Sequence, residues 1–292
     1  MEGKRVLITG ATSGIGLESA RELARRGAGL VLACRNDEKA DRVRDELVAS
    51  GSAAVDVVHL DLASLDSVRA CAAQLESAFD SLDVLVNNAG VFRMAREESA
   101  DGFELTLATN HLGPFLLTTL VLPLLERAGP ARIVNVASAA YRYGRLRFDD
   151  LQRRRWRGRV GWTGFRAYAD SRLATVLFTR ELARRLEGTE ITVNSCHPGH
   201  VATNIFPRAP GLMGLVMSWT SRLRIPAADG AGPVVRLALD PALEGVSGEY
   251  YDRYERQAVP PRLAAPELAL RLWEASVALT DAPPGVVPRR AG

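Results

Sequence analysis

A tyrosine and an arginine four residues apart, Tyr168 and Arg172, form a pair of side chains with clear potential for acid–base chemistry. Four residues make about one helical turn, so both side chains share a face if this segment is helical. A free phenol has a pKa near about 10, and a positive charge about 4 Å away at an effective dielectric of about 20 favours phenolate by roughly 4 kcal/mol. The pair therefore predicts a phenol whose ionised form is favoured by a nearby cation.

A glycine-rich segment, Thr9-Gly10-Ala11-Thr12-Ser13-Gly14-Ile15-Gly16, separates a strand-like run at 5–9 from a helical pattern at 15–26. In this context a pyrophosphate can bind at the N-terminus of the helix. Gly10 permits the tight turn, Gly14 lets the backbone approach the ligand, and Gly16 lets the helix lie close to the strand. The segment predicts a dinucleotide site that includes Thr12, Ser13 and Ile15.

The end of the next strand predicts which dinucleotide binds. Sites that prefer NAD usually place an acidic residue there, where it accepts hydrogen bonds from the adenosine ribose. This chain has Arg35 instead, followed by Asn36. Because a guanidinium can pair with a 2′-phosphate, we expect NADP(H), with Asn36 as a second contact. A solvated loop arginine is the alternative interpretation.

Strand-like and helical patterns alternate along the first two hundred residues. We expect strands at 5–9, 30–34, 55–62, 84–90, 131–138 and 191–199, and helices at 15–26, 37–50, 64–78, 106–128 and 166–187. A last strand near 247–251 and a terminal helix at 265–280 follow an interruption at 204–230. Such apolar strands separated by helices indicate a parallel sheet covered on both faces. We predict a doubly wound, Rossmann-like α/β fold that forms a single domain over 1–292.

The composition excludes several classes of protein. The net charge is only +3 over 292 residues, and basic residues do not alternate with aromatic ones, so we expect no nucleic-acid partner. Metal-binding motifs are absent, so we expect no metal. His197 and His200 flank a turn at Pro198-Gly199 and could reach a pocket, but a structural role is the simpler interpretation.

The cysteines and the N-terminal residues favour a cytoplasmic protein. Cys34, Cys71 and Cys196 form no CxxC pair and fall in or beside apolar segments, which indicates reduced, buried thiols. A strand-like run begins at Arg5, which leaves no room for a signal peptide. The apolar stretch at 115–125 is about half of a membrane span, so we expect a buried helix there.

Taken together, these motifs resemble the short-chain dehydrogenase/reductase family, in particular its retinol-dehydrogenase-like branch, over nearly the whole chain. The family patterns are a TGxxxGxG loop, an acidic pair, an NNAG motif, and a serine thirty residues before a tyrosine. The matching positions are Thr9 to Gly16, Asp61, Leu62, Asn87, Asn88, Ala89, Gly90, Asn110, Ser138, Tyr168, Pro198, Gly199, Val201 and Thr203.

The resemblance implies a role for each matching residue. Tyr168 would exchange a proton with the substrate oxygen while the nicotinamide exchanges hydride. Ser138 would hold that oxygen, and Asn110 would anchor a water that passes protons to bulk solvent. Asp61 and Leu62 would contact adenine, the segment at 88–90 would line the cofactor, and the segment at 198–203 would frame the nicotinamide. The family also implies a homodimer through the helices at 106–128 and 166–187.

The sequence departs from the family at Arg172, because the family motif is YxxxK. A lysine ammonium bonds both ribose hydroxyls in the family, whereas guanidinium is larger, planar and effectively never deprotonated. Lysine occurs in this chain only at Lys4 and Lys39, so composition drift explains a tolerated substitution in a working oxidoreductase. The alternative is an NADP(H)-binding homologue redirected to non-redox chemistry, such as cyclisation or elimination, or to a binding role.

Two further segments are expected to contact the substrate. Residues 204–230 contain an apolar, methionine-rich patch that predicts a substrate lid, and hence a bulky lipophilic substrate. Packing of a helix on the core is the alternative for this segment. The connection between Ser138 and Tyr168 contains Tyr143 and Trp162 and is expected to rim the pocket. Its arginines at 153–157 fit an exposed loop, or contacts to an anionic substrate.

Overall fold

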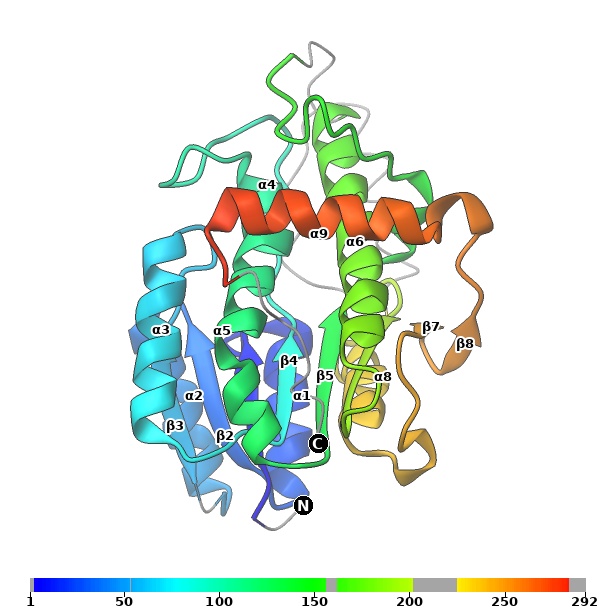
Figure 1. Cartoon of the computed structure of the whole chain (residues 1–292). Coiled ribbons are helices and arrows are strands. Elements are labelled where there is room, and N and C mark those ends of the chain that lie inside the picture. Colours follow the sequence, from blue (N-terminus) through cyan, green and yellow to red (C-terminus); the bar gives the residue numbers. More distant parts are fainter. Residues whose placement is uncertain (1–2, 53, 156–161, 202–224, 284–292) are drawn as a thin grey trace.

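One eight-stranded sheet runs through the protein, with strand order β3-β2-β1-β4-β5-β6-β7-β8 (Figure 1). The computed structural model describes residues 3–52, 54–155, 162–201 and 225–283. The strands are β1 (Arg5–Thr9), β2 (Gly29–Cys34), β3 (Val55–His59), β4 (Val84–Asn87), β5 (Ala131–Val136), β6 (Ile191–His197), β7 (Tyr250–Asp252) and β8 (Glu255–Gln257). Neighbouring strands are parallel except that β8 pairs antiparallel to β7. The predicted single-domain, doubly wound α/β fold is confirmed.

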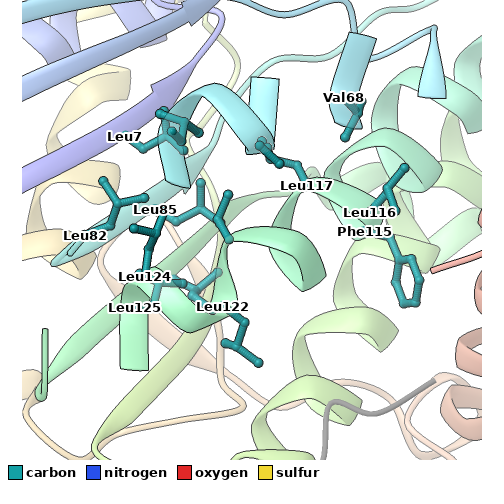
Figure 2. Packing of buried hydrophobic residues seen from close by; sticks show 14 of the residues in the cluster. Leu7, Val68, Leu82, Leu85, Phe115, Leu116, Leu117, Leu122, Leu124 and Leu125 are labelled. Carbon is teal, nitrogen blue, oxygen red and sulfur yellow. The ribbon is translucent and has the colours of Figure 1, made fainter. Parts of the chain in front are cut away.

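Helices cover both faces of the sheet because the strand side chains alternate between two apolar clusters. In β1, Val6 and Ile8 join the cluster beneath α1 (Gly14–Arg25), α2 (Asp37–Ala49) and α8 (Ala227–Leu239). Leu7 joins the cluster beneath α3 (Leu65–Ala78), α5 (Gly113–Arg127) and α6 (Trp162–Arg185). Figure 2 shows Leu7 and Leu85 of the sheet gathered with leucines of α5.

The predicted helix at 106–128 is continuous but not uniform. It begins as α4 (Leu105–Leu107), passes through a π-helical turn, η1 (Ala108–Leu112), and continues as α5. Within the described ranges, this Leu105–Arg127 segment is the one helix long and apolar enough to cross a bilayer, and 89% of its apolar window is buried in the fold. It forms part of the core, as expected for the apolar stretch at 115–125.

Several predicted boundaries were wrong by a few residues. Strands β3, β4, β5 and β6 end two to three residues earlier than expected, so residues 88–90 of the NNAG segment, Ser138 and Pro198 follow the strands at the carboxyl edge of the sheet. Helix α6 begins four residues before the predicted 166. Helix α8 and strand β8 were not predicted at all.

The last helix, α9 (Pro266–Thr280), crosses the outer side of α5 and α6 (Figure 1). Its Trp273 packs edge-on against Phe115 of α5, with ring centroids 4.9 Å apart, and stacks on Phe178 of α6. Its Ser276 Oγ lies 2.7 Å from His111 Nε2 in η1. Helix α9 therefore packs on the Phe115 end of α5 and on α6, the two helices at which the family resemblance places a dimer contact.

Candidate active site

A cavity of about 1020 Å³ opens at the carboxyl ends of the parallel strands, where ligands bind in open α/β sheets. It brings together almost every predicted site residue from segments far apart in the sequence. The predicted residues that line it are Gly10, Thr12, Ser13, Gly14, Ile15, Gly16, Arg35, Asn36, Asp61, Leu62, Asn88, Ala89, Gly90, Ser138, Tyr168, Arg172, Pro198, Gly199 and Val201. Asn110 lies behind the wall, and Thr203 lies outside the described residues together with 204–224 of the predicted lid.

The glycine-rich loop is shaped for close approach by a ligand. Gly10 and Gly14 have φ of +69° and +57°, which favour glycine. A methyl group on Gly16 would overlap the Gly10 carbonyl oxygen and the Asn88 side chain. Ser13 begins α1 without capping it through its side chain, so the first amide groups of the helix are left to bind an anion. The loop fits a pyrophosphate.

Asn88 and Thr9 hold this loop to the end of β4. The Asn88 side-chain amide donates to the Thr9 carbonyl at 2.9 Å and to the Gly10 carbonyl at 3.3 Å. Thr9 Oγ1 accepts from the backbone N–H groups of Asn88 and Ala89, both at 3.0 Å. These bonds fix the glycine loop before any ligand arrives.

The end of β2 presents two cations to the cavity. Arg35 and Lys39 are exposed and line it, and neither forms an ion pair with a carboxylate of the described residues. Asn36 Oδ1 accepts from Lys39 N at 2.8 Å and so caps α2. Next to them, Asp61 turns its carboxylate toward its own loop, where Oδ1 accepts from Ala63 N at 2.9 Å. This end of the cavity suits a phosphate.

Tyr168 and Arg172 meet as the four-residue spacing predicts. The Arg172 guanidinium lies 5.0 Å from the centroid of the Tyr168 ring, and both side chains line the cavity. Arg172 is 3% exposed. Its Nη1 donates to the Val136 carbonyl at 3.0 Å, its buried Nε has no hydrogen-bond partner, and no carboxylate of the described chain pairs with it. The site therefore holds a buried positive charge without a counter-ion beside a phenol.

Ser138 and Phe92 lie around the same tyrosine. Phe92 packs edge-on against the Tyr168 ring, with centroids 5.5 Å apart. Ser138 Oγ accepts from Ala140 N at 3.3 Å and so begins the 3₁₀ turn η2 (Ala139–Tyr143). Its hydroxyl proton is not used by this bond, so the side chain can cap the turn and still donate to a ligand in the cavity.

Asn110 positions the wall of the site rather than lining it. Its Oδ1 accepts from Val91 N at 2.7 Å, and its Nδ2 donates to the Val91 carbonyl at 2.9 Å and to Ser171 Oγ at 3.0 Å. These bonds connect the π-helical turn to the loop after β4 and to α6. Its predicted water-anchoring role stays a prediction.

Several cavity residues were missed from the sequence. Lys39, Val91, Cys34 and Phe165 line the site. Phe165 precedes Tyr168 by three residues, and this helical spacing could have revealed it. The thiol of Cys34 is buried, which raises its pKa to about 11, so it behaves as a small apolar side chain.

Asp170 stands between Tyr168 and Arg172 in the sequence but serves another purpose. Its Oδ1 accepts from Arg145 N at 2.8 Å, and its Oδ2 pairs with Arg153. Burial raises the pKa of this carboxyl, and the Arg153 charge opposes that rise. The pair connects the loop after η2 to α6. Arg153 is therefore a buried arginine in an ion pair rather than an exposed loop arginine.

The two histidines around Pro198-Gly199 also line the cavity. Their rings meet edge-on, with centroids 5.4 Å apart. Burial lowers the pKa of His197 to about 4, so this imidazole is neutral at physiological pH. Within the described segments, no three His, Cys, Asp or Glu side chains are grouped to hold a metal ion.

The chain matches the family model described as short chain dehydrogenase over residues 4–148 and 156–210. Retinol dehydrogenase 14 of Mus musculus is 42% identical over 292 residues, which are 94% of this chain and 85% of that protein. Dehydrogenase/reductase SDR family member 13 of Homo sapiens is 44% identical over 291 residues, covering 98% of this chain and 75% of that protein.

Solved structures share the fold. An uncharacterised protein from Mycobacterium paratuberculosis superimposes with a TM-score of 0.75 and 34% identity, over 96% of this chain and 94% of that one. A protein assigned as an NAD(P)-dependent gluconate 5-dehydrogenase from Beutenbergia cavernae, solved with bound NADP at low occupancy, has a TM-score of 0.69 and 30% identity. That match covers 86% of this chain and 95% of the other.

Proposed function

Because this chain belongs to the short chain dehydrogenase family, we propose that it is an NADP(H)-dependent oxidoreductase that interconverts a carbonyl and an alcohol on a bulky apolar substrate. The supporting observation is the contact between Arg172 and Tyr168. A guanidinium that pairs with no carboxylate of the described residues lies against the phenol ring, in the same cavity as the glycine-rich loop. Tyr168 is the acid–base group in this proposal.

Each side chain then has a defined task. The nicotinamide of the bound cofactor supplies or accepts the hydride. Tyr168 gives its proton to the carbonyl oxygen during reduction and takes a proton from the alcohol during oxidation. Arg172 holds its positive charge against the ring of this tyrosine. Ser138 donates a hydrogen bond to the same substrate oxygen, where negative charge develops.

The preference for NADP(H) is supported by Arg35 and Lys39. Both cations line the cavity at the end of β2 and lack carboxylate partners among the residues described. A 2′-phosphate would pair with them, whereas the ribose hydroxyl of NAD(H) would find no carboxylate to accept its hydrogen bonds. The uncapped α1 N-terminus would hold the pyrophosphate of either dinucleotide.

The apolar substrate is supported by the opposite wall of the cavity. Val91, Ala137, Tyr143 and Phe165 line it, and Tyr143 and Phe165 have ring centroids 5.9 Å apart. Exposed Trp162 stacks on Phe165 at the rim. The names of the mouse relative and of retinol dehydrogenase 12 and 13 of Homo sapiens point to the same class of substrate. The lid over residues 204–230 remains part of the proposal.

Single-turnover oxidation of bound NADPH with a panel of large ketones and aldehydes tests this function. We expect measurable hydride transfer by the protein and a faster rate for Arg172→Lys, because the compact ammonium can bond the ribose hydroxyls. Arg132→Lys is the matched control, since Arg132 bonds the Leu237 and Asp240 carbonyls and does not line the cavity. If neither the protein nor Arg172→Lys transfers hydride although both bind NADPH tightly, redox chemistry is excluded and the redirected interpretation holds.

A further inference from the structure

His197, the last residue of β6, lies at the reacting end of the cavity and makes no side-chain hydrogen bond to the residues that the structure describes. It is 7% exposed and lines the cavity. Its Nδ1 is fully buried, and neither ring nitrogen hydrogen-bonds to a residue in the described part of the chain. A buried polar group normally has a partner, so the missing one is expected to come from whatever occupies the cavity.

The surroundings of His197 keep its ring neutral. Arg172 faces it from α6, Arg253 from the turn after β7, and His200 from the loop after β6, and all three oppose protonation. Asp252 of β7 favours protonation, but burial outweighs it and the pKa falls to about 4. A neutral imidazole offers one donor and one acceptor. It therefore matches a hydroxyl group better than a phosphate, which would prefer a cation.

Arg172 leaves such a hydroxyl without its usual partner. The guanidinium gives Nη1 to the Val136 carbonyl, and its Nη2 packs against the Gly90 backbone. One of the arginine donors is thus tied to the sheet, and the planar guanidinium does not reproduce the compact geometry of an ammonium at the ribose hydroxyls. His197 is close enough for the Arg172 charge to act on it and lines the same cavity.

We propose that His197 is a cofactor-binding residue that hydrogen-bonds the nicotinamide-side ribose hydroxyls of bound NADP(H), a contact that Arg172 does not supply. This inference rests on the proposed cofactor but not on hydride transfer. The proposal implies that two kinds of side chain bind the dinucleotide, one at each end. Cations at Arg35 and Lys39 meet the phosphate end, and a neutral ring meets the ribose at the other end.

Binding of two probes tests the assignment. NADPH contains both ends of the dinucleotide, whereas adenosine 2′,5′-bisphosphate lacks the nicotinamide ribose. We expect His197→Ala to weaken NADPH binding about tenfold, which is the typical loss for one or two hydrogen bonds, and to leave binding of the bisphosphate unchanged. His197→Gln, whose amide can replace one ring nitrogen, should recover part of the loss. His59→Ala, an exposed histidine outside the cavity, is the matched control.

The imidazole signal of His197 gives a second readout that requires no folded alanine variant. The chain has four histidines, so His197→Gln identifies the signal by its disappearance. In the unmodified protein this signal should shift on addition of NADPH and stay in place with the bisphosphate.

Three outcomes separate this inference from the proposed function. If the protein binds neither NADPH nor the bisphosphate, the proposed cofactor is wrong. If it binds both probes, but His197→Ala binds NADPH as tightly as the parent or loses both probes equally, the ribose contact is overturned. An unmoved His197 signal on saturation with NADPH overturns it as well.

Discussion

At the nucleotide end of the cavity, the groups that face a ligand are mostly backbone amides, whereas at the reacting end they are buried side chains. The glycine loop is held by Thr9 and Asn88 through bonds within a few residues of β1 and β4. Tyr168, Arg172 and His197 come from α6 and β6, and no carboxylate among the described residues pairs with the Arg172 charge. Main-chain geometry can thus fix where the dinucleotide binds. Proton transfer, in contrast, depends on side chains that only the complete fold brings together.

The largest expected effect comes from a substitution at the reacting end of the cavity that leaves the nucleotide end unchanged. Tyr168→Phe should lower the single-turnover rate of NADPH oxidation by about 10³-fold, because a positioned acid–base group contributes about 10²–10⁴-fold. The NADPH dissociation constant should change less than twofold, because the ring and its contact with Phe92 remain. Stopped-flow absorbance and equilibrium fluorescence measure the two quantities. A rate within tenfold of the parent would contradict the role of Tyr168.

The second effect comes from a substitution at the nucleotide end of the cavity that leaves the reacting end unchanged. Arg35→Ser should weaken NADPH binding by about 10–100-fold, the range expected for charge-assisted hydrogen bonds, and leave NADH binding unchanged. Arg42→Ser is the control, since Arg42 lies on α2, pairs with Glu38 and does not line the cavity. Equal losses for NADPH and NADH would show that Arg35 does not recognise a 2′-phosphate.

A smaller effect tests whether the absence of a side chain at Gly16 is required for cofactor binding and for close packing of the glycine loop. Gly16→Ala should weaken NADPH binding about tenfold and lower the free energy of unfolding by about 1–3 kcal/mol, because the added methyl overlaps the Gly10 carbonyl and Asn88. Gly29→Ala is matched, since a methyl there meets its nearest neighbours at 3.7 Å. Calorimetry and urea unfolding report both effects. Identical behaviour of the two variants would remove the steric explanation for Gly16.

A last effect, of a different kind, concerns acid stability. Burial lowers the pKa of His197 to about 4 and that of His111 to about 3, both below the ordinary value of 6.5. As the pH falls below about 6.5, the unfolded chain takes up protons at these rings and the folded chain does not. The free energy of unfolding should therefore fall by up to about 1.4 kcal/mol per pH unit for each ring until the folded pKa is reached.

Urea unfolding between pH 7 and pH 4 measures this dependence. His111→Gln should flatten the slope, whereas His59→Gln, at an exposed position outside the cavity, should keep it. An unchanged slope for His111→Gln would show that the ring is accessible to protons in the folded protein.

Local features of the site could be predicted from the sequence because they depend on neighbouring residues. The glycine loop can be recognised from its flanking strand and helix, although the distant Asn88 also holds it, and the Tyr168–Arg172 contact follows from one helical turn. The Val136 carbonyl that binds Arg172 could not be foreseen, since it lies 36 residues away and is a backbone group. The ties from Asn110 to Val91 and Ser171 likewise depend on the packed fold.

The unpredicted elements have weak local signals. Helix α8 contains two glycines and Pro233, which lower helix propensity. The structure shows a tertiary reason for one of them, because a methyl on Gly230 would overlap Val201 at the edge of the cavity. Strand β8 is three residues long, Glu255–Gln257, and wholly polar, so no apolar alternation marks it.

The C-terminal helix has a consequence for how the molecule could assemble. Because α9 is tethered to the helices that it covers, it competes for them at an effective concentration that a free second molecule rarely matches. Two copies that joined through the part of α5 and α6 beneath α9 would first have to exchange or release this segment. Truncation before Pro266 would expose the Phe115 and Phe178 rings to solvent. Exposed apolar surface of this kind favours self-association. We therefore expect changes in α9 to affect association before they affect catalysis.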